Sequence, residues 1–231
     1  MDQSTYFPIL LDLKGRSCVV VGGGEVASRK VTALLEAGAV VKVISPTVTS
    51  LLARLAAEGR IQHQSEAYSP GDLRGAFLVI AATDDEEVNR LVNREAEERS
   101  QLINVVDVPE LSSFIFPSVL RRGALTVAVS TGGASPALAA GLRRRLEGIL
   151  GQEYALYLDL LARARRYILE HWEKDERRRQ VLLSLGRSDL LPFLQRGDIK
   201  GALAEIDRIT GQEDFSKKAA LMGSDRNHDD L

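Results

Sequence analysis

A triple glycine between an apolar strand pattern and a helical pattern constrains this chain more than any other feature. The β-branched run at residues 16–21 ends abruptly at Gly22-Gly23-Gly24, and apolar residues then recur at helical spacing over residues 25–37. The segment matches the pattern G-x-G-x-x-A, whose three key positions are Gly22, Gly24 and Ala27. Such a turn lets the backbone approach a pyrophosphate at the positive end of a helix. This context favours a dinucleotide-binding loop over its alternative, a tight turn without a ligand.

The alternation of strand and helix continues through the first 106 residues. Further strands are predicted at residues 39–44, 61–64, 77–82 and 102–106. Between them, one helix is predicted to begin at a cap formed by Ser45-Pro46 and to run to Glu58, and another to span the acid-rich residues 85–99. Fully apolar strands that alternate with helices indicate a parallel sheet covered on both faces. We therefore expect an α/β fold with a Rossmann-type parallel sheet.

The pattern changes after Asp107. Two extended runs, at residues 113–120 and 125–130, flank the turn Arg121-Arg122-Gly123. A glycine-rich step then leads to a helix at residues 136–150, which Ser135 is expected to cap and in which Pro136 takes the first position.

From Glu153 onward the chain reads as helical and heavily charged. Gly186, Pro192 and Gly197 are expected to divide this region into short helices. The last segment, from Gly211 to Leu231, is polar and is expected to fray.

Composition excludes several classes of function. The 231 residues carry 30 Lys+Arg against 32 Asp+Glu, a net charge of −2, so no overall field attracts nucleic acid or a membrane surface. The single Cys18 excludes a disulfide framework and a cysteine-based metal site, and three separated histidines disfavour a histidine cage, so no resident metal is expected. The first residues lack a signal-peptide pattern, and no run reaches about 18 apolar residues, which predicts a cytoplasmic protein.

Ten residues are candidates for contact with the dinucleotide, because they follow predicted strands at the edge where such sheets bind ligands. They are Gly22, Gly23, Gly24, Glu25, Val26, Ser45, Pro46, Thr47, Ala82 and Thr83. The acidic ribose ligand expected about 20 residues after the glycines is missing. Ser45 and Thr47 can hydrogen-bond a ribose hydroxyl without repelling a 2′-phosphate, which leaves NAD and NADP open on these residues alone.

Two neighbouring positions have alternative interpretations. Thr83 or Asp84 can equally serve as the cap of the helix that follows. Lys30, in the helix after the glycines, is either a solvated surface charge or a phosphate ligand, and the first is favoured.

Four sequence blocks, taken in order, resemble a known family. They are VGGGEVASRK at 21–30, IAATDDEEVN at 80–89, NVVD at 104–107 with SSFIFPS at 112–118, and VAVSTGGASPALA at 127–139. Together they are similar to the precorrin-2 dehydrogenase/sirohydrochlorin ferrochelatase family, the N-terminal module of siroheme synthases. The similarity covers residues 4–150, and the helical remainder is consistent with it but unspecific.

The resemblance implies an NAD-dependent oxidoreductase that converts precorrin-2 to sirohydrochlorin. In many members it also implies a lyase activity, the insertion of Fe²⁺ into sirohydrochlorin to give siroheme, for which the residues themselves offer no positive evidence. The chain is too short for the methyltransferase module of some relatives, so no methyl transfer is expected.

The family also implies a homodimer, whose interface comes from the segment after the nucleotide-binding domain. Two extended runs too short for a sheet of their own gain from pairing across a two-fold axis. The expected domains are an NAD-binding Rossmann domain at 1–112, a dimerisation segment at 113–150 and a helical domain with a disordered tail at 151–231.

Asp107 is the candidate catalytic residue. It follows the buried run at residues 103–106, so we expect it at the rim of the sheet rather than on an open surface. It matches the acidic residue to which the family assigns the central role. Dehydrogenation releases a proton, as does metal insertion into a pyrrole ring, so one carboxylate can act as general base in both steps. The alternative is an aspartate whose side chain caps the bend before Val108-Pro109.

The substrate-binding candidates are Ser130, Thr131, Gly132 and Gly133. Backbone N–H groups of this step can receive acetate or propionate groups, and a flexible hinge is an equal alternative. Arg121, Arg122 and the run Arg143–Arg145 are candidate partners of the same carboxylates, although an arginine run on a helix is more often a solvated face.

Two other function classes fit part of the pattern. A nucleotide-sensing regulatory module shares the glycine loop but needs neither NVVD nor the block at 127–139. A tetrapyrrole-binding protein without turnover would keep the substrate residues but would not oxidise precorrin-2.

Overall fold

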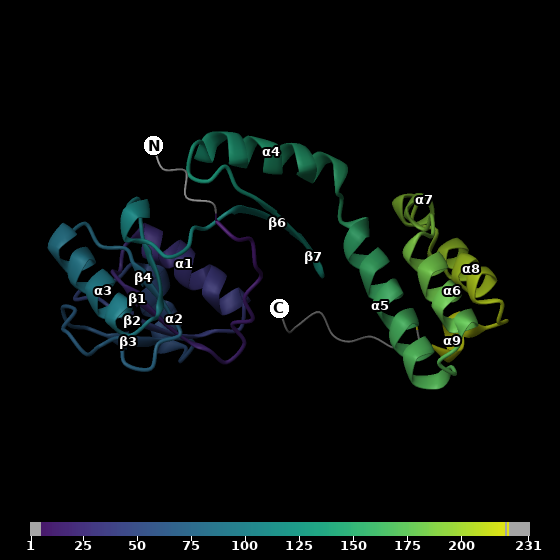
Figure 1. Ribbon diagram of the computed structural model, residues 1–231, viewed down its shortest axis with the longest axis horizontal. Coiled ribbons are helices and arrows are strands. Elements are labelled where there is room, and N and C mark those ends of the chain that lie inside the picture. Colours follow the sequence, from purple (N-terminus) through teal and green to yellow (C-terminus); the bar gives the residue numbers. More distant parts are fainter. Residues whose placement is uncertain (1–5, 220, 222–231) are drawn as a thin grey trace. The chain divides into compact units, whose positions relative to one another are not determined.

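The computed structural model describes residues 6–219 and Leu221. The chain divides into two compact units (Figure 1). Unit 1 comprises the chain up to Phe116 together with Gly132–Ala134, and unit 2 comprises Pro117–Thr131 and the chain from Ser135 onward. Among the described residues, no helix is both long enough and apolar enough to cross a membrane.

Unit 1 is built on a five-stranded parallel sheet. Its strands are β1 (Ser17–Val21), β2 (Val40–Ile44), β3 (Gln62–Gln64), β4 (Leu78–Ala81) and β5 (Leu102–Val105). They lie in the order β3-β2-β1-β4-β5, so the chain changes direction across the sheet between β1 and β4. The predicted Rossmann-type sheet is confirmed, and each strand begins and ends within one residue of its predicted bounds. In this topology ligands bind beyond the carboxyl ends of the strands, at the switch point.

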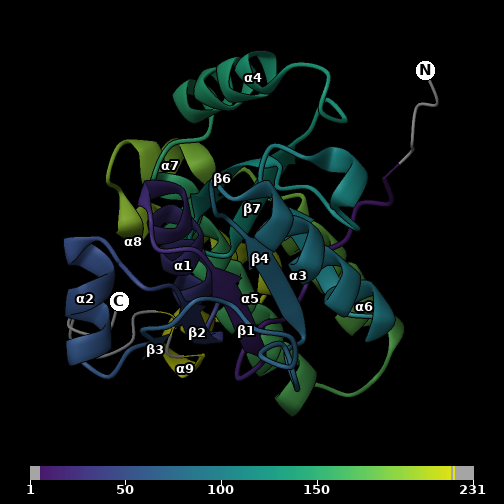
Figure 2. The same cartoon turned by 90° about the vertical axis from the view of Figure 1, so that its left-hand side faces the viewer.

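Both faces of the sheet are buried because successive strand residues point to opposite sides. Val20 packs on one face with α1 (Glu25–Glu36) and α2 (Ser50–Ala57), whereas Val19 packs on the other face with α3 (Glu86–Glu98). Figure 2 shows α2 and α3 on opposite sides of the strands. This is why the strands read as continuous apolar runs rather than as alternating ones.

Two helix starts differ from the prediction. Helix α2 begins at Ser50 after Thr49, whose side chain accepts from the Leu52 N–H, so Ser45-Pro46 is not its cap. Helix α3 begins after Asp85, whose carboxylate accepts from the N–H groups of Glu87 and Val88, so neither Thr83 nor Asp84 is the cap. A short 3₁₀ turn, η1 (Pro109–Leu111), follows β5.

Unit 2 begins with an antiparallel hairpin of β6 (Ser118–Arg122) and β7 (Leu125–Val129). The first strand starts later than predicted, and Arg121 and Arg122 lie in it rather than in the turn. Gly123, with φ +55°, makes the turn. The two runs pair with each other, with Ser118 opposite Val129. Helix α4 (Pro136–Ile149) follows, and Ser135 caps it as predicted by accepting from the Leu138 N–H.

The remaining helices of unit 2 share one apolar core. They are α5 (Glu153–His171), α6 (Glu176–Gly186), α7 (Leu191–Gln195), α8 (Ile199–Thr210) and α9 (Phe215–Lys218). The breaks after α6 and after α7 fall at the predicted Gly186 and Gly197. Pro192 instead lies in the first turn of α7, and the break between α5 and α6 was not predicted. The core includes Leu160, Ile206 and Phe215.

The prediction that the chain frays from Gly211 is wrong for residues 211–219, because Phe215 is fully buried and anchors α9 in the core of unit 2. The rest of the predicted disordered tail lies outside the described residues, apart from Leu221, which is also buried.

Candidate functional site at the carboxyl edge of the sheet

The glycine loop has a conformation that its first two glycines alone permit. Gly22 has φ +119°, and a Cβ there would lie 2.2 Å from the Ala82 carbonyl oxygen. A Cβ on Gly23 would lie 2.0 Å from the Thr47 carbonyl oxygen. The ends of β2 and β4 are thus packed directly against the loop, which requires glycine at both positions.

Gly24 differs from its two neighbours because a Cβ there would meet open space. It is the N-cap of α1 and supplies no side-chain cap, so the first N–H groups of the helix lack a side-chain acceptor. An exposed main chain at a helix N-terminus, beside Glu25, is suited to a pyrophosphate. The donors present therefore fit a dinucleotide.

The end of β2 is held by its own polar groups. The Ser45 hydroxyl donates to the Thr47 carbonyl at 2.7 Å, which shapes the loop that meets Gly23. His63 on β3 lies with Nε2 2.9 Å from the Ser45 carbonyl oxygen. Pro46 and Thr47 are exposed at this edge. Ser45 thus acts on the loop, and the exposed Thr47 is the better placed of the two for a ribose.

The end of β4 is held in a similar way. The Thr83 hydroxyl lies 3.1 Å from Asn89 Oδ1, and Asn89 Nδ2 donates to the Thr83 carbonyl at 2.9 Å. Asn89 is buried on α3 and fixes the turn after Ala82. His63 and Asn89 also support the site, and neither was predicted, because each contacts a main-chain carbonyl, 18 and 6 residues away, that no sequence motif marks.

Asp107 lies in the turn directly after β5. Its φ is +60°, a left-handed conformation that aspartate tolerates better than most residues. The main chain on either side is fixed, because the Val106 N–H donates to the Ala81 carbonyl at 2.9 Å and the Val108 N–H to the Val105 carbonyl at 3.2 Å. The residue is at the predicted rim of the sheet, but it is exposed, contrary to expectation. Within the described residues no hydrogen bond or ion pair engages its carboxylate, so the side chain does not cap the bend.

Lys30 is not the freely solvated charge that its helical pattern favours. Its side chain is half-buried, and its Nζ lies 3.5 Å from the centroid of the Phe116 ring. Burial lowers the pKa of this lysine, the Arg29 charge lowers it further, and the Asp107 carboxylate opposes both. The segment that carries Phe116 is held in turn by Asn104, whose Nδ2 donates to the Phe114 carbonyl at 3.0 Å, and by an edge-on contact of the Phe114 and Phe116 rings. Asn104 thus has a structural role.

The four substrate-binding candidates fall on both sides of the division between the units. Gly132 and Gly133, with φ +62° and +89°, belong to unit 1, and a Cβ on either would meet open space. Ser130 and Thr131 belong to unit 2, where the Thr131 hydroxyl oxygen accepts from the Ser135 N–H at 3.0 Å. Their assignment as substrate ligands stays a prediction.

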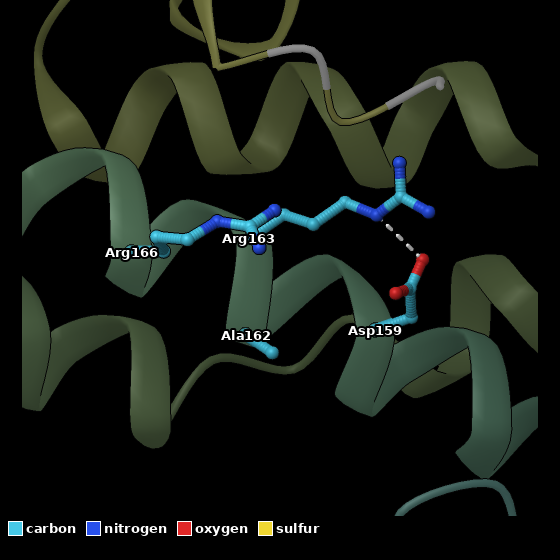
Figure 3. A pocket seen from close by; sticks show the side chains of 4 residues that line it. All are labelled: Asp159, Ala162, Arg163 and Arg166. Atoms are coloured by element: carbon cyan, nitrogen blue, oxygen red, sulfur yellow. Dashed lines mark ion pairs between the residues drawn. The ribbon is translucent and has the colours of Figure 1, made fainter. Parts of the chain in front are cut away.

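Two of the arginine candidates have partners within unit 2. Arg122 Nε donates to the Leu150 carbonyl at 3.0 Å, and Arg143 forms an ion pair with Glu147 on the same helix face. A hollow of about 240 Å³ on α5 holds other arginines (Figure 3). It is lined by Asp159, Ala162, Arg163 and Arg166, with Arg163 Nε 2.8 Å from Asp159 Oδ2, and contains none of the predicted site residues.

Two family models match the chain in succession. Residues 9–118 match the model described as "Putative NAD(P)-binding", and residues 122–149 match "Sirohaem biosynthesis protein central". The first match contains the glycine loop and Asp107, and the second contains β7 and α4 together with the last residue of β6.

Curated relatives and a solved structure agree with these matches. The chain is 49% identical to the siroheme synthase of Methylobacillus flagellatus over 172 residues, which is 74% of this chain and 37% of that protein. It is 37% identical to the siroheme synthase of Chromobacterium violaceum over 228 residues, 98% of this chain and 48% of that protein. The chain thus spans less than half the length of these relatives.

The fold is similar to that of SirC, a precorrin-2 dehydrogenase, with a TM-score of 0.75 and 29% identity over 88% of this chain and 100% of that one. The predicted resemblance is confirmed by these matches. The sheet order, the glycine loop, the two successive models and the relatives all agree, and the chain belongs to the precorrin-2 dehydrogenase and siroheme synthase family.

Proposed function

We propose that this chain oxidises precorrin-2 to sirohydrochlorin with NAD as the electron acceptor. The observation that carries the proposal is the position of Asp107, whose exposed carboxylate stands at the same edge of the sheet as the glycine loop. A base and a nucleotide site on one edge is the arrangement that a dehydrogenase needs. The names of the siroheme synthases and of SirC support the choice of substrate.

The residues of unit 1 divide the binding of the cofactor between them. The N–H groups at Gly24, Glu25 and Val26 would hold the pyrophosphate, and the exposed Thr47 would contact a ribose. Ala82 and Thr83 follow β4 at the switch point between β1 and β4, where they would contact the cofactor. NAD, when bound there, supplies the acceptor for the hydride that leaves precorrin-2.

Asp107 would take up the proton that balances this hydride transfer. The substrate loses two hydrogens, one as a hydride with its electron pair and one as a proton, and the proton passes to a carboxylate oxygen of Asp107. Because no described residue engages that carboxylate, both of its oxygens remain available. The strand end holds the main chain of Asp107 in place, so the carboxylate moves only by rotation of its own short side chain.

We also propose Fe²⁺ insertion into sirohydrochlorin as a second activity. Iron is a substrate in this step, and two pyrrole N–H protons leave as it enters the ring. Asp107 is suited to accept a proton here as well. The support comes from the siroheme synthase relatives.

We propose in addition that the chain acts as a cytoplasmic homodimer. The support is the β6–β7 hairpin, which has a single pairing among the described residues and thus two unpaired edges. Val119 on β6 is an exposed apolar residue at one of them. Pairing with a second copy would satisfy both features.

Replacement of Asp107 tests the proposed function. Purified wild type with precorrin-2 and NAD should give the absorbance of sirohydrochlorin. Asp107→Asn, which keeps the shape of the side chain, should lower this rate about 100-fold or more, since a positioned base contributes that much. Its affinity for NAD should stay within about twofold, because the glycine loop is intact.

Glu98→Gln is the matched control, since it also removes one exposed carboxylate but lies at the end of α3, toward the opposite edge of the sheet. Unchanged turnover in Asp107→Asn would refute the role of this residue. Wild type that binds NAD without oxidising precorrin-2 would favour the nucleotide-sensing alternative. Wild type that binds the tetrapyrrole without turnover would favour a carrier. A parallel assay with sirohydrochlorin and Fe²⁺ tests the second activity.

A further inference from the structure

Lys30 is a half-buried cation without a close anionic partner. Among the described residues, no carboxylate lies within 4.0 Å of its Nζ and no acceptor takes a hydrogen bond from it. Its contacts are the Phe116 ring and the longer-range attraction of Asp107. The ring occupies one side of the ammonium, which has three N–H donors. Lys30 therefore presents unused donors in the neighbourhood of the candidate base.

A buried charge of this kind is costly without compensation. The loss of hydration is reflected in the lowered pKa of Lys30, to which the neighbouring Arg29 adds. Phe116 restores part of the lost stabilisation through its ring face. An anionic group of a ligand would restore more, through a charge-assisted hydrogen bond.

The position of Lys30 favours one of two possible anionic partners, a substrate carboxylate, over the other, a cofactor phosphate. It is six residues beyond Gly24 in α1, which corresponds to about 9 Å along the helix axis from the pyrophosphate site. Its ammonium is held on Phe116, five residues after the end of η1, rather than over the first turn of α1. The Asp107 carboxylate, the candidate base, is near enough to act on the charge of this ammonium. A substrate group is therefore favoured over the cofactor phosphates.

We propose that Lys30, held by Phe116, binds a carboxylate of the tetrapyrrole substrate next to Asp107. The inference rests on the proposed function, in which the substrate carries acetate and propionate side chains. Lys30 would fix the rotation of the macrocycle relative to Asp107, so that the hydrogen to be removed faces the base. It acts as a binding residue and takes no part in proton transfer.

Binding measurements without NAD test this inference apart from turnover. The affinity for sirohydrochlorin is followed by its visible absorbance in wild type, Lys30→Met and Lys30→Arg. Lys30→Met should raise the dissociation constant about tenfold, as expected for a lost charge-assisted hydrogen bond, and Lys30→Arg should restore it to within about threefold. Added salt should weaken binding more in wild type than in Lys30→Met.

Steady-state kinetics should show that Lys30 affects the binding of the tetrapyrrole and not the binding of NAD. In Lys30→Met the KM for precorrin-2 should rise about tenfold, while the KM for NAD stays within about twofold. Lys14→Met, which removes an exposed lysine of unit 1, is the matched control and should behave like wild type. Weaker NAD binding with unchanged tetrapyrrole affinity would assign Lys30 to a phosphate and overturn the proposal.

Failure of the inference is distinguishable from failure of the proposed function. Wild type that does not oxidise precorrin-2 refutes the function, whereas wild type that does, with equal sirohydrochlorin affinity in Lys30→Met, refutes only the inference. Thermal unfolding shows whether Lys30→Met folds. If it does not, Phe116→Leu, which keeps the lysine but removes the ring, should raise the dissociation constant about threefold. An unchanged dissociation constant in Phe116→Leu would overturn the proposed role of Lys30 and Phe116.

Discussion

In unit 1 the candidate site is held by main-chain contacts, whereas the helices of unit 2 are held by a core of large apolar side chains. Gly22 and Gly23 let the ends of β2 and β4 approach the loop within distances that any Cβ would block. In unit 2, Leu160, Ile206 and Phe215 fill one core between the helices. The first kind of contact tolerates almost no added atom, and the second tolerates a range of shapes at a cost in packing. Close main-chain contacts are therefore suited to a site that must hold a nucleotide and a base in fixed positions.

The largest expected effect lies in unit 2. Phe215→Ala should lower the free energy of unfolding of this unit by about 3–5 kcal/mol, because a fully buried ring leaves a cavity and loses its edge contacts with Tyr167 and Trp172. Denaturant unfolding followed by the fluorescence of Trp172, the only tryptophan, measures it. Retained NAD affinity would support separate means of stabilisation in the two units. Loss of NAD binding together with the helices would contradict that distinction.

A smaller but more specific effect is expected at the glycine loop. Gly23→Ala should destabilise unit 1 by about 1–3 kcal/mol and abolish measurable NAD binding, because the new methyl group meets the Thr47 carbonyl. Gly24→Ala is the matched control for folding, since its methyl group meets open space and stability should change by less than about 1 kcal/mol. Its NAD affinity should still fall, because the methyl group enters the volume assigned to the pyrophosphate. Equal unfolding midpoints for both variants would refute this account of the loop.

The smallest expected effect is the contribution of Glu95 to the pH dependence of unit 1. Burial alone would raise the pKa of this α3 carboxylate, but hydrogen bonds from Tyr68, the Gly71 N–H and Arg99 outweigh it and lower the pKa. A lowered folded-state pKa stabilises the protein above the unfolded value, near 4.3, and this stabilisation is lost as the pH falls through the folded value. Glu95→Gln should therefore flatten the loss of stability in acid below about pH 4.5. Chemical denaturation at pH 3–7 gives the free energy of unfolding at each pH. The same pH dependence in wild type and Glu95→Gln would contradict the prediction.

The strands of unit 1 were predictable because their signal is local. Each is a short apolar run bounded by glycine or polar residues, and because both faces of the sheet are buried, the run needs no alternation of apolar and polar residues to be recognised. The caps were harder to predict, because several residues able to cap stand close together before α2 and α3. Thr49 caps α2 where its N–H donates to the Gly23 carbonyl, a contact 26 positions back in the chain that no local pattern contains. Asp85 caps α3 after a turn that Asn89 holds through the Thr83 carbonyl.

The candidate site was predictable only where its chemistry is local. Gly22 and Gly24 stand in a motif, and Asp107 follows a strand, so both were found. The contact of Lys30 with Phe116 joins residues 86 positions apart, and a lysine in an amphipathic helix reads as solvated. Phe215 is one aromatic residue in a polar segment, too weak a signal to predict the burial that anchors α9.

The left-handed backbone at Asp107 restricts which acids can stand there. Aspartate and asparagine adopt such a φ readily, whereas glutamate does so at a greater cost. A longer carboxylate at this position would thus strain the main chain before its extra reach entered the chemistry at all. The short side chain also leaves few rotamers for the proton acceptor to sample. The geometry of the turn therefore selects the amino acid as much as the reaction does, and the two requirements coincide in one residue.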